Sequence, residues 1–561
     1  MNDKFTIQTY SIVKYFFKFA AVVILLFFYD HLFAQYTRQD TLRGSITPGR
    51  SWWDVIRYDI HVTPDYISKT IRGSNTISFK GMNTSTEYMQ IDLQEPLIID
   101  SIIYKNSSLS FQRDGNAWLV KWPTNLDHLK VDKMIIYYHG KPREARRPPW
   151  NGGWQWAKDE KGRPWMTVTC QGLGASVWYP CKDHQSDEPD NGASLTITIA
   201  DSLIAIGNGR LTDKKKNNNG TTSWKWEVKS PINNYNIIPY IGKYVNWQED
   251  YEGEQGKLEC SYWVLDYNLA KAKRQFGRDI HPTLKCFEDW FGPYPFYEDS
   301  YKLVESPHLG MEHQSAVAYG NKYMNGYLGM DLSGTGWGNG WDYIIIHETG
   351  HEWFANNITT NDIADMWVHE GFTTYSEVLY VECRYGKQAA DEYCRGIRQN
   401  IQNDKPIIGD YGVNKEGSED MYPKGANLIH SIRQVINNDA TFKKILRGLN
   451  KDFFHKTVDT KDVENYISRH SGKDLSKIFD QYLRTNQIPV LEYKIERHSL
   501  SYRWTNCVKG FNMPIKIKSG GRDQWISPEE KWQTQQMADW FNEKSFSVDE
   551  NFYIKVKKVN R

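Results

Sequence analysis

Hydrophobic and polar positions alternate in short runs over the first half of the chain. Runs such as SLTITIA and SWKWEV place an apolar side chain at every second position, which is typical of strands that bury one face. Clusters of Gly, Asn and Asp separate these runs and indicate turns. The pattern therefore predicts an all-β N-terminal domain over residues 36–245.

The hydrophobic period changes near Asn268. In LAKAKRQFGRDIHPTLKCFEDWF the apolar residues recur three and four positions apart, and NLIHSIRQVI and DLSKIFDQYL repeat that pattern, as expected for helices with one buried face. Strand-like runs return after QIPVLEY. We expect a multidomain α+β fold, with a mostly helical domain over residues 246–487 and a short β-sandwich over residues 488–561.

The N-terminus has the layout of an export signal. Three lysines precede the apolar run FAAVVILLFFY, residues 19–29, and Ala34 offers a small residue for cleavage. The run has eleven residues, too few to cross about 30 Å of hydrocarbon as a helix. Residues 1–34 are predicted to be a signal peptide of an exported protein, periplasmic or extracellular, with an uncleaved anchor as the alternative.

Composition excludes some classes of partner. Lys plus Arg number 69 and Asp plus Glu number 68, for a net charge of +1, so the overall charge indicates no nucleic acid and no anionic membrane. No stable membrane insertion is expected after signal removal. The seven cysteines show no C-x-x-C spacing, so other residues must supply any metal site.

The stretch IIIHETGHEWF contains two histidines four positions apart, His347 and His351, with Glu348 between them. Residues i and i+4 share one helix face, so both imidazoles can point at one metal ion. Glu348 is then placed to act as general base on a metal-activated water. Gly350 costs about 1 kcal/mol inside a helix, so we expect a close backbone neighbour there.

A catalytic zinc site needs a third protein ligand and an open position. Glu370 follows His351 by nineteen residues, on a second predicted helix. Adjacent His369 competes with it, but neighbouring helical residues point about 100° apart, and we choose Glu370 because two histidines and a carboxylate form an established set. The alternative is two buried structural histidines and a solvated carboxylate.

The motif HETGH with its downstream glutamate, together with WFANNIT and WVHEGFTTYSE, resembles the aminopeptidase N family of zinc gluzincins, which includes the leukotriene hydrolases. The resemblance implies an N-terminal β-domain, a thermolysin-like catalytic domain and a short C-terminal β-domain. The large C-terminal helical domain of many members is expected to be absent, because the chain ends at Arg561.

Further motifs resemble those that bind substrate in that family. HLGMEHQ is similar to Gly-x-Met-Glu-Asn, which implies that Glu312 binds the substrate's α-amino group, with Met311 beside it. Leu309 and His313 depart from this motif and leave local backbone geometry and substrate preference open. CQGLGASVW is similar to the segment that adds a second amine contact, here Gln171.

MYPKGA resembles the family's Tyr-x-Lys-Gly-Ala stretch, which implies that Tyr422 donates a hydrogen bond to the oxyanion of the tetrahedral intermediate. The sequence thus predicts a zinc aminopeptidase with one Zn²⁺ per chain that removes N-terminal residues from peptides. Two alternatives stay open: a zinc endopeptidase without a working amine anchor, and a catalytically weak peptide-binding protein. First-residue preference, disulfide pairing and oligomeric state do not follow from the sequence.

Overall fold

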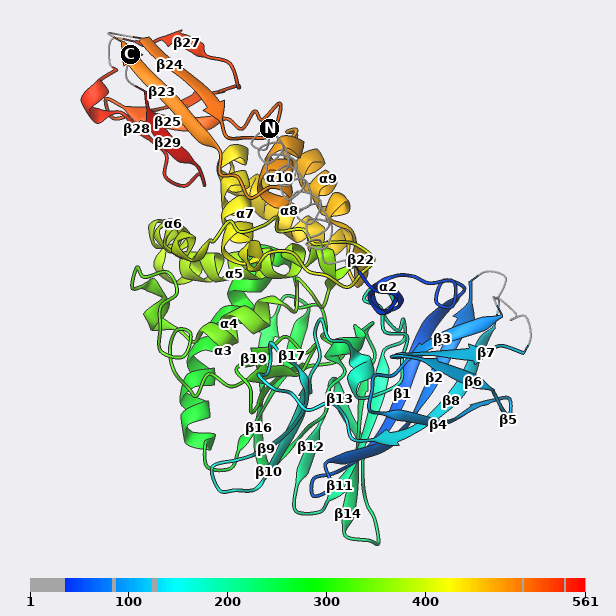
Figure 1. Cartoon of the computed structure of the whole chain (residues 1–561). Helices are drawn as coiled ribbons and strands as arrows, with labels where there is room; N and C mark the ends of the chain where they lie inside the picture. The colour runs from blue at the N-terminus through cyan, green and yellow to red at the C-terminus, as the bar shows by residue number, and fades with distance from the viewer. Residues whose placement is uncertain (1–35, 83–86, 124–129, 497–498, 539–540, 560–561) are drawn as a thin grey trace, which may run out of the picture.

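The computed structural model describes residues 36–82, 87–123, 130–496, 499–538 and 541–559. The predicted signal peptide lies outside these residues. Among the helices described, none combines the length and the apolar character needed to span a membrane. The N-terminal β-domain, the central helical domain and a small C-terminal β-domain follow one another along the chain (Figure 1).

The N-terminal domain is built on an eight-stranded sheet in the order β13-β14-β11-β1-β2-β8-β4-β5, antiparallel except for the parallel pair β1 and β11. The predicted runs form β11 and β14, and β14 alternates between buried and half-buried side chains along its whole length. The prediction of an all-β domain is confirmed. Its strands are β1 Trp53–Asp65, β2 Thr70–Gly81, β4 Ile98–Tyr104, β5 Ser107–Ser108, β8 Val131–Gly140, β11 Ala193–Ala200, β13 Arg210–Lys216 and β14 Thr221–Val228.

Two smaller sheets complete this domain, in the orders β3-β7-β6 and β12-β15-β10-β9. A short helix, α2 Arg38–Gly44, precedes them. The small-sheet strands are β3 Tyr88–Asp92, β6 Phe111–Asp114, β7 Ala117–Lys121, β9 Gly153–Lys158, β10 Pro164–Thr169, β12 Ile204–Ile206 and β15 Tyr240–Gly242.

The central domain contains a five-stranded sheet that helical periodicity does not reveal. Its order is β16-β17-β18-β20-β19, and β16 spans the predicted boundary at residue 245. The strands are β16 Tyr244–Gly253, β17 Gly256–Leu265, β18 Tyr301–Glu305, β19 Gly310–Met311 and β20 Val317–Tyr319; β21 Ile358–Thr360 pairs separately with β22 Lys456–Val458.

Three helices of this domain, α3, α7 and α10, correspond to the segments whose hydrophobic period predicted helices. Asn268 is the N-cap of α3, and Pro423 occupies the first turn of α7, where its missing N–H costs nothing. The helices are α3 Leu269–Phe291, α4 Tyr343–Gly350, α5 Trp367–Tyr385, α6 Lys387–Gly396, α7 Pro423–Ile436, α8 Asp439–Asp452, α9 Thr460–Ser471 and α10 Ser476–Arg484.

The C-terminal domain has two sheets, β27-β24-β23-β29 and β26-β25-β28, and lies beyond α7 and α10 at the top of Figure 1. The short β-domain expected from sequence is therefore present. Its strands are β23 Val490–Glu496, β24 Ser499–Thr505, β25 Ile515–Ser519, β26 Arg522–Ile526, β27 Gln533–Gln536, β28 Ser547–Val548 and β29 Lys555–Lys558.

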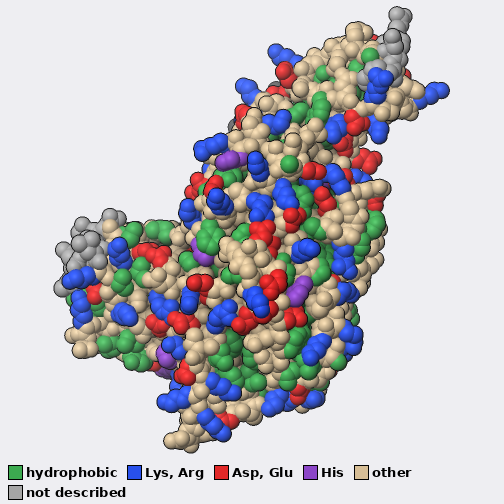
Figure 2. All heavy atoms as spheres, turned by 180° about the vertical axis from the view of Figure 1, so that it is seen from behind, with side chains coloured by type: hydrophobic (Ala, Val, Ile, Leu, Met, Phe, Trp, Pro, Cys, Tyr) green, Lys and Arg blue, Asp and Glu red, His purple; other side chains and the backbone are tan. Residues whose placement is uncertain are grey.

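Across the face of the molecule shown in Figure 2, basic and acidic side chains are interspersed.

Helix α5 packs closely against its neighbours. A disulfide between Cys286 and Cys383 joins it to α3. A Cβ on Gly425 of α7 would lie 2.9 Å from the Cα atom of Gly371 in α5, so the two helices touch through their glycines. A Cβ on Gly350 of α4 would lie 2.4 Å from the Ser376 hydroxyl. The close neighbour expected at Gly350 exists, but it is a side chain of α5 and not backbone.

The glycine contact between α5 and α7 predicts the effect of a methyl group. Gly425→Ala should push the helices apart and destabilise the protein by about 1–3 kcal/mol, the usual effect of overpacking, visible as a lower midpoint of thermal unfolding. Gly277→Ala in α3 is the control, because nothing lies within 4 Å of its added Cβ. Equal midpoints for Gly425→Ala and wild type would contradict this packing.

Candidate active site

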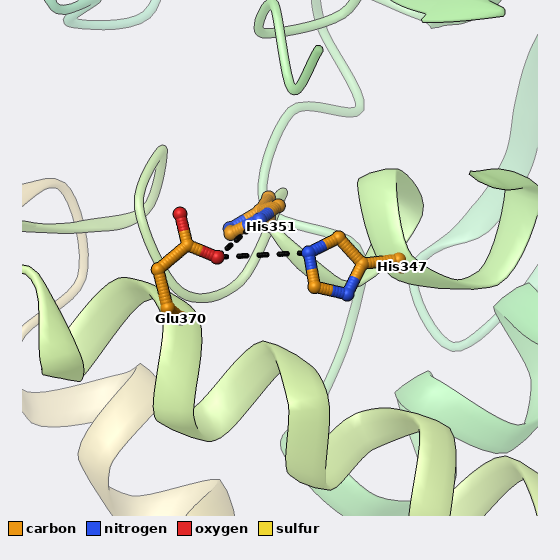
Figure 3. A group of neighbouring side chains, drawn as sticks. All are labelled: His347, His351 and Glu370. Atoms are coloured by element: carbon orange, nitrogen blue, oxygen red, sulfur yellow. Dashed lines mark ion pairs between the residues drawn. The ribbon is translucent and has the colours of Figure 1, made fainter. Parts of the chain in front are cut away.

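Helices α4 and α5 bring the two histidines and the glutamate together. Asp342 caps the start of α4 by accepting a hydrogen bond from the Ile344 amide at 3.2 Å. His347 lies in the last turn of α4 and His351 directly follows it, still with helical backbone angles. Glu370 lies in the first turn of α5. Figure 3 shows the three side chains converging from the two segments.

The three predicted ligands form a buried cluster. The Oε2 atom of Glu370 lies 3.6 Å from Nε2 of His347 and 3.3 Å from Nε2 of His351 (Figure 3). This oxygen is buried and has no hydrogen-bond partner, which is costly unless a cation binds it. Two imidazole nitrogens and a carboxylate oxygen in this arrangement fit a zinc ion.

Outer contacts fix which ring nitrogen faces the cluster. The Nδ1 atom of His347 is 2.7 Å from Oε1 of Glu377, and the Tyr393 hydroxyl donates to the other oxygen of Glu377. The Nδ1 atom of His351 donates to the carbonyl of Phe354 at 3.0 Å. Both Nε2 atoms are thereby left as metal donors, as in other histidine metal sites. Sequence reasoning missed Glu377; its signal is a spacing of two helical turns after Glu370.

The charges of the cluster depend on one another. Burial alone would raise the pKa of Glu370, but the adjacent imidazoles of His351 and His347 outweigh it and hold that pKa below the usual range. Burial would likewise lower the pKa of His351, but Glu370 raises it to about 9. A divalent cation would displace these protons and take over their role of neutralising Glu370.

His369, the competing ligand, faces elsewhere. Its Nε2 atom accepts a hydrogen bond from the backbone amide of Thr360, at the end of β21, at 2.9 Å. Burial lowers its pKa to about 3, so the ring is a neutral acceptor in the core. Adjacent positions on α5 thus point to different places, in line with the helical angle between them.

Glu348 lies where the edge strand β19 meets α4. Its carboxyl group is buried, and burial raises its pKa to about 7. A Cβ on Gly310 would lie 2.5 Å from Oε1 of Glu348, so a larger residue there would displace the Glu348 carboxyl group. The departures in HLGMEHQ have local structural effects: Leu309 lines the cavity beside Gly310, and buried His313 has its Nδ1 atom 2.6 Å from the Tyr240 hydroxyl.

Glu312 is the centre of a second polar cluster. Gln171, from the N-terminal domain, donates its side-chain amide to Oε1 of Glu312, and the Tyr235 hydroxyl donates to the same oxygen at 2.8 Å. Glu312 is buried, and burial raises its pKa. Gln171 and Glu312, which only the family resemblance had linked, are thus in direct contact. Sequence reasoning missed Tyr235, which no local pattern distinguishes.

The cluster of His347, His351 and Glu370 and the cluster around Glu312 line one cavity of about 600 Å³. Tyr422, the N-cap of α7, lies against it with its ring centre 6.0 Å from that of His347. Burial keeps the pKa of Tyr422 well above its usual value, so the phenol retains its proton. All eight residues expected at the site line this cavity: Gln171, Met311, Glu312, His347, Glu348, His351, Glu370 and Tyr422.

Comparison with known proteins agrees with this geometry. Residues 55–235 match the peptidase M1 N-terminal domain, and residues 279–482 match the peptidase family M1 domain. The chain belongs to the peptidase M1 family. Its fold is similar to that of an M1 zinc metallopeptidase from Deinococcus radiodurans, with a TM-score of 0.65, 20% identity, and coverage of 78% of this chain and 95% of that one.

Curated M1 relatives are distant in sequence. Aminopeptidase M1 of Arabidopsis thaliana is 22% identical over 84% of this chain and 54% of its own length, and aminopeptidase N of Lactococcus lactis is 22% identical over 78% and 52%. Leukotriene A-4 hydrolase of Xenopus laevis is 22% identical over 78% and 72%. The chain spans about half the length of the first of these M1 relatives.

The hydrogen bond from His347 to Glu377 predicts a change in metal affinity. Glu377→Gln should weaken zinc binding about 10- to 100-fold. The neutral glutamine amide no longer offers the His347 ring a charged hydrogen-bond acceptor. Competition with a chromophoric chelator measures the affinity without any assay of activity.

Glu348→Gln is the matched control for that measurement. It makes the same carboxylate-to-amide change on α4, and Glu348 is neither an expected metal ligand nor a partner of a ligand's Nδ1 atom. Zinc affinity should therefore stay at the wild-type value, while turnover is lost. Equal zinc affinities for Glu377→Gln and wild type would show that Glu377 does not support the metal site.

Proposed function

We propose that this M1 protein is a zinc-dependent aminopeptidase that removes single residues from the free N-termini of peptides, with one Zn²⁺ per chain. The observation that carries the proposal is the buried carboxylate of Glu312, held by Gln171 and Tyr235 in the cavity that contains the three-ligand cluster. A buried carboxylate of this kind needs a cationic partner, and the free α-ammonium of a peptide supplies one.

The names of the relatives support the same reaction. Several are called aminopeptidases, and a mutant of the Deinococcus radiodurans metallopeptidase was solved with a Tyr-Ser-Ala substrate. The apolar run at residues 19–29 supports action outside the cytoplasm.

The expected site residues have distinct parts in this reaction. His347, His351 and Glu370 would hold the zinc ion, which would supply Lewis-acid chemistry at the scissile carbonyl and the attacking water. Glu348 takes the proton from the attacking water and passes it to the leaving amine. Its close packing against Gly310 keeps that carboxylate beside the edge strand.

The remaining residues orient the substrate and stabilise developing charge. Gln171 and Tyr235 hold one oxygen of Glu312, so the carboxylate presents a fixed geometry to the ammonium. Met311 contributes an apolar wall next to this anchor. Tyr422 donates its phenolic hydrogen to the oxyanion that forms from the scissile carbonyl.

The amine anchor predicts a strict requirement for a free N-terminus. Of two peptides that differ only in N-acetylation, the zinc-loaded enzyme should cleave only the free one, releasing residues singly from its N-terminus, as followed by mass spectrometry. Glu348→Gln is the control for contaminating peptidases. Equal cleavage of both peptides would instead indicate an endopeptidase, and cleavage of neither, with zinc bound, a peptide-binding protein.

The assignment of Tyr422 predicts a selective loss in the chemical step. Tyr422→Phe removes one oxyanion donor, which should lower kcat about 100- to 1000-fold while KM changes little. Steady-state kinetics on a dipeptide measures both constants. A kcat within a few-fold of wild type would remove Tyr422 from the catalytic residues.

A further inference from the structure

The segment that carries Glu312 packs against the four-stranded sheet of the N-terminal domain. A row of three buried side chains crosses that sheet, with Gln155 on β9, Thr167 on β10 and Tyr240 on β15. The register pairs Thr167 with Gln155 on one side and places it across from Tyr240 on the other. Residues directly opposite each other in an antiparallel pair share one face of the sheet, so the three side chains point the same way.

Two buried histidines contact the ends of this row. His308 and His313 lie on either side of β19, which leads to Glu312. The Nδ1 atom of His308 is 3.1 Å from the side-chain nitrogen of Gln155, and that of His313 is 2.6 Å from the Tyr240 hydroxyl. The centres of the two rings are 6.2 Å apart. The same sheet therefore holds the segment before and after β19.

The contacts of each ring fix which nitrogen carries the proton. Burial lowers the pKa of His308 to about 3 and holds the pKa of His313 well below its usual value, so both rings are neutral. The amide nitrogen of Gln155 can only donate, so Nδ1 of His308 accepts and its Nε2 atom bears the hydrogen. The Tyr240 hydroxyl donates to the carbonyl of Ala316 at 2.7 Å. It therefore accepts from Nδ1 of His313, whose Nε2 atom is left as an acceptor.

Three polar atoms between the ends of the row have no hydrogen-bond partner among the described residues. They are the Nε2 atoms of His308 and His313 and the hydroxyl of Thr167. Each of these side chains is at most 4% exposed, and buried polar groups are normally paired. Because each Nδ1 atom faces a flanking strand, the Nε2 atoms lie on the inner sides of the rings. One donor, one acceptor and a hydroxyl suit a buried water molecule, which typically makes about three hydrogen bonds.

We propose that His308 and His313 are positioning residues for the amine anchor and that one buried water molecule joins them. The water accepts a hydrogen bond from Nε2 of His308 and donates to Nε2 of His313 and to the hydroxyl of Thr167. The inference rests on the proposed aminopeptidase function, in which Glu312 binds the α-ammonium group of the substrate.

This chain of hydrogen bonds fixes Glu312 relative to the residue that assists it. Glu312 directly precedes His313. Gln171, which donates to Glu312, lies two residues beyond the end of β10, the strand that carries Thr167. A shift of the segment against β10 would therefore change the contact between Glu312 and Gln171. The departure at His313 from the Gly-x-Met-Glu-Asn motif supplies one end of the chain.

The test measures how much the α-amino group contributes to binding. Leucine hydroxamate and its des-amino analogue, isocaproyl hydroxamate, both chelate zinc and differ only in that group. Calorimetric titration into the zinc-loaded protein gives the ratio of their dissociation constants without any turnover. The wild type should bind the analogue about tenfold or more weakly. In His308→Phe and in His313→Phe this ratio should fall about threefold or more, and the double variant should lower it no further, because both rings belong to one chain.

Matched controls separate this role from a loss of stability. The ring of His430 is as buried as that of His313 and does not line the catalytic cavity, so His430→Phe should keep the wild-type ratio. Thr167→Val is a milder second variant that removes only a hydroxyl, and it should also lower the ratio. Thr196→Val on β11 should not, although the hydroxyl of Thr196 is likewise buried without a partner in the described part of the chain.

The outcomes distinguish this inference from the proposed function. A high wild-type ratio that His308→Phe, His313→Phe and Thr167→Val all leave unchanged would overturn the inference alone. A wild-type ratio near one would mean that Glu312 binds no amine, and the proposed function would fail as well. Single effects that multiply in the double variant would show two independent contacts and overturn the chain.

A crystal structure of the wild type provides a check that needs no ligand. One water molecule within about 3.2 Å of both Nε2 atoms would support the chain between His308 and His313. Density for no water molecule at that position would exclude it.

Discussion

The structure depends on one buried electrostatic arrangement, in which the carboxylate of Glu370 lies between the imidazoles of His347 and His351. Removing a carboxylate from water costs several kcal/mol unless cations or donors surround it. Here the compensating imidazoles are those of His347 in α4 and of His351 directly after it, and they are themselves oriented by Glu377 and Phe354. The site therefore requires α4 and α5 to approach closely and to keep their register.

Glycines make that approach geometrically possible. Gly350 allows α4 to lie against Ser376 on α5, and Gly371 allows α7 to cross α5 at Gly425. The second crossing places the start of α7, with Tyr422, beside His347. The N-terminal domain then closes the cavity with Gln171 and Tyr235, which donate hydrogen bonds to Glu312 of the central domain, so the polar cluster around Glu312 draws on both domains.

Local periodicity was enough to predict much of the fold. Period-two runs gave β11 and β14, and the change of period at Asn268 marked the start of α3. The short strands β18 to β20 were not predicted because a buried strand of two to five residues has no distinguishable period. His347 and His351 could be predicted because their spacing of four residues places both on one helix face.

Residues that act through tertiary contacts could not be found in this way. Gln171 and Glu312 are 141 positions apart, and only a resemblance suggested their pairing, while Tyr235 had no signal at all. Such contacts depend on how separate elements pack, which one-dimensional patterns do not encode.

Anomalous diffraction at the zinc edge, from crystals of the zinc-loaded protein, would test the central claim most directly. We expect one peak per chain, about 2.0–2.2 Å from Nε2 of His347, Nε2 of His351 and a carboxylate oxygen of Glu370. Glu312, Glu348 and His351 form a second group whose ligand atoms also lie within 4.8 Å of one another. A peak at that group, or no peak at either, would contradict the account.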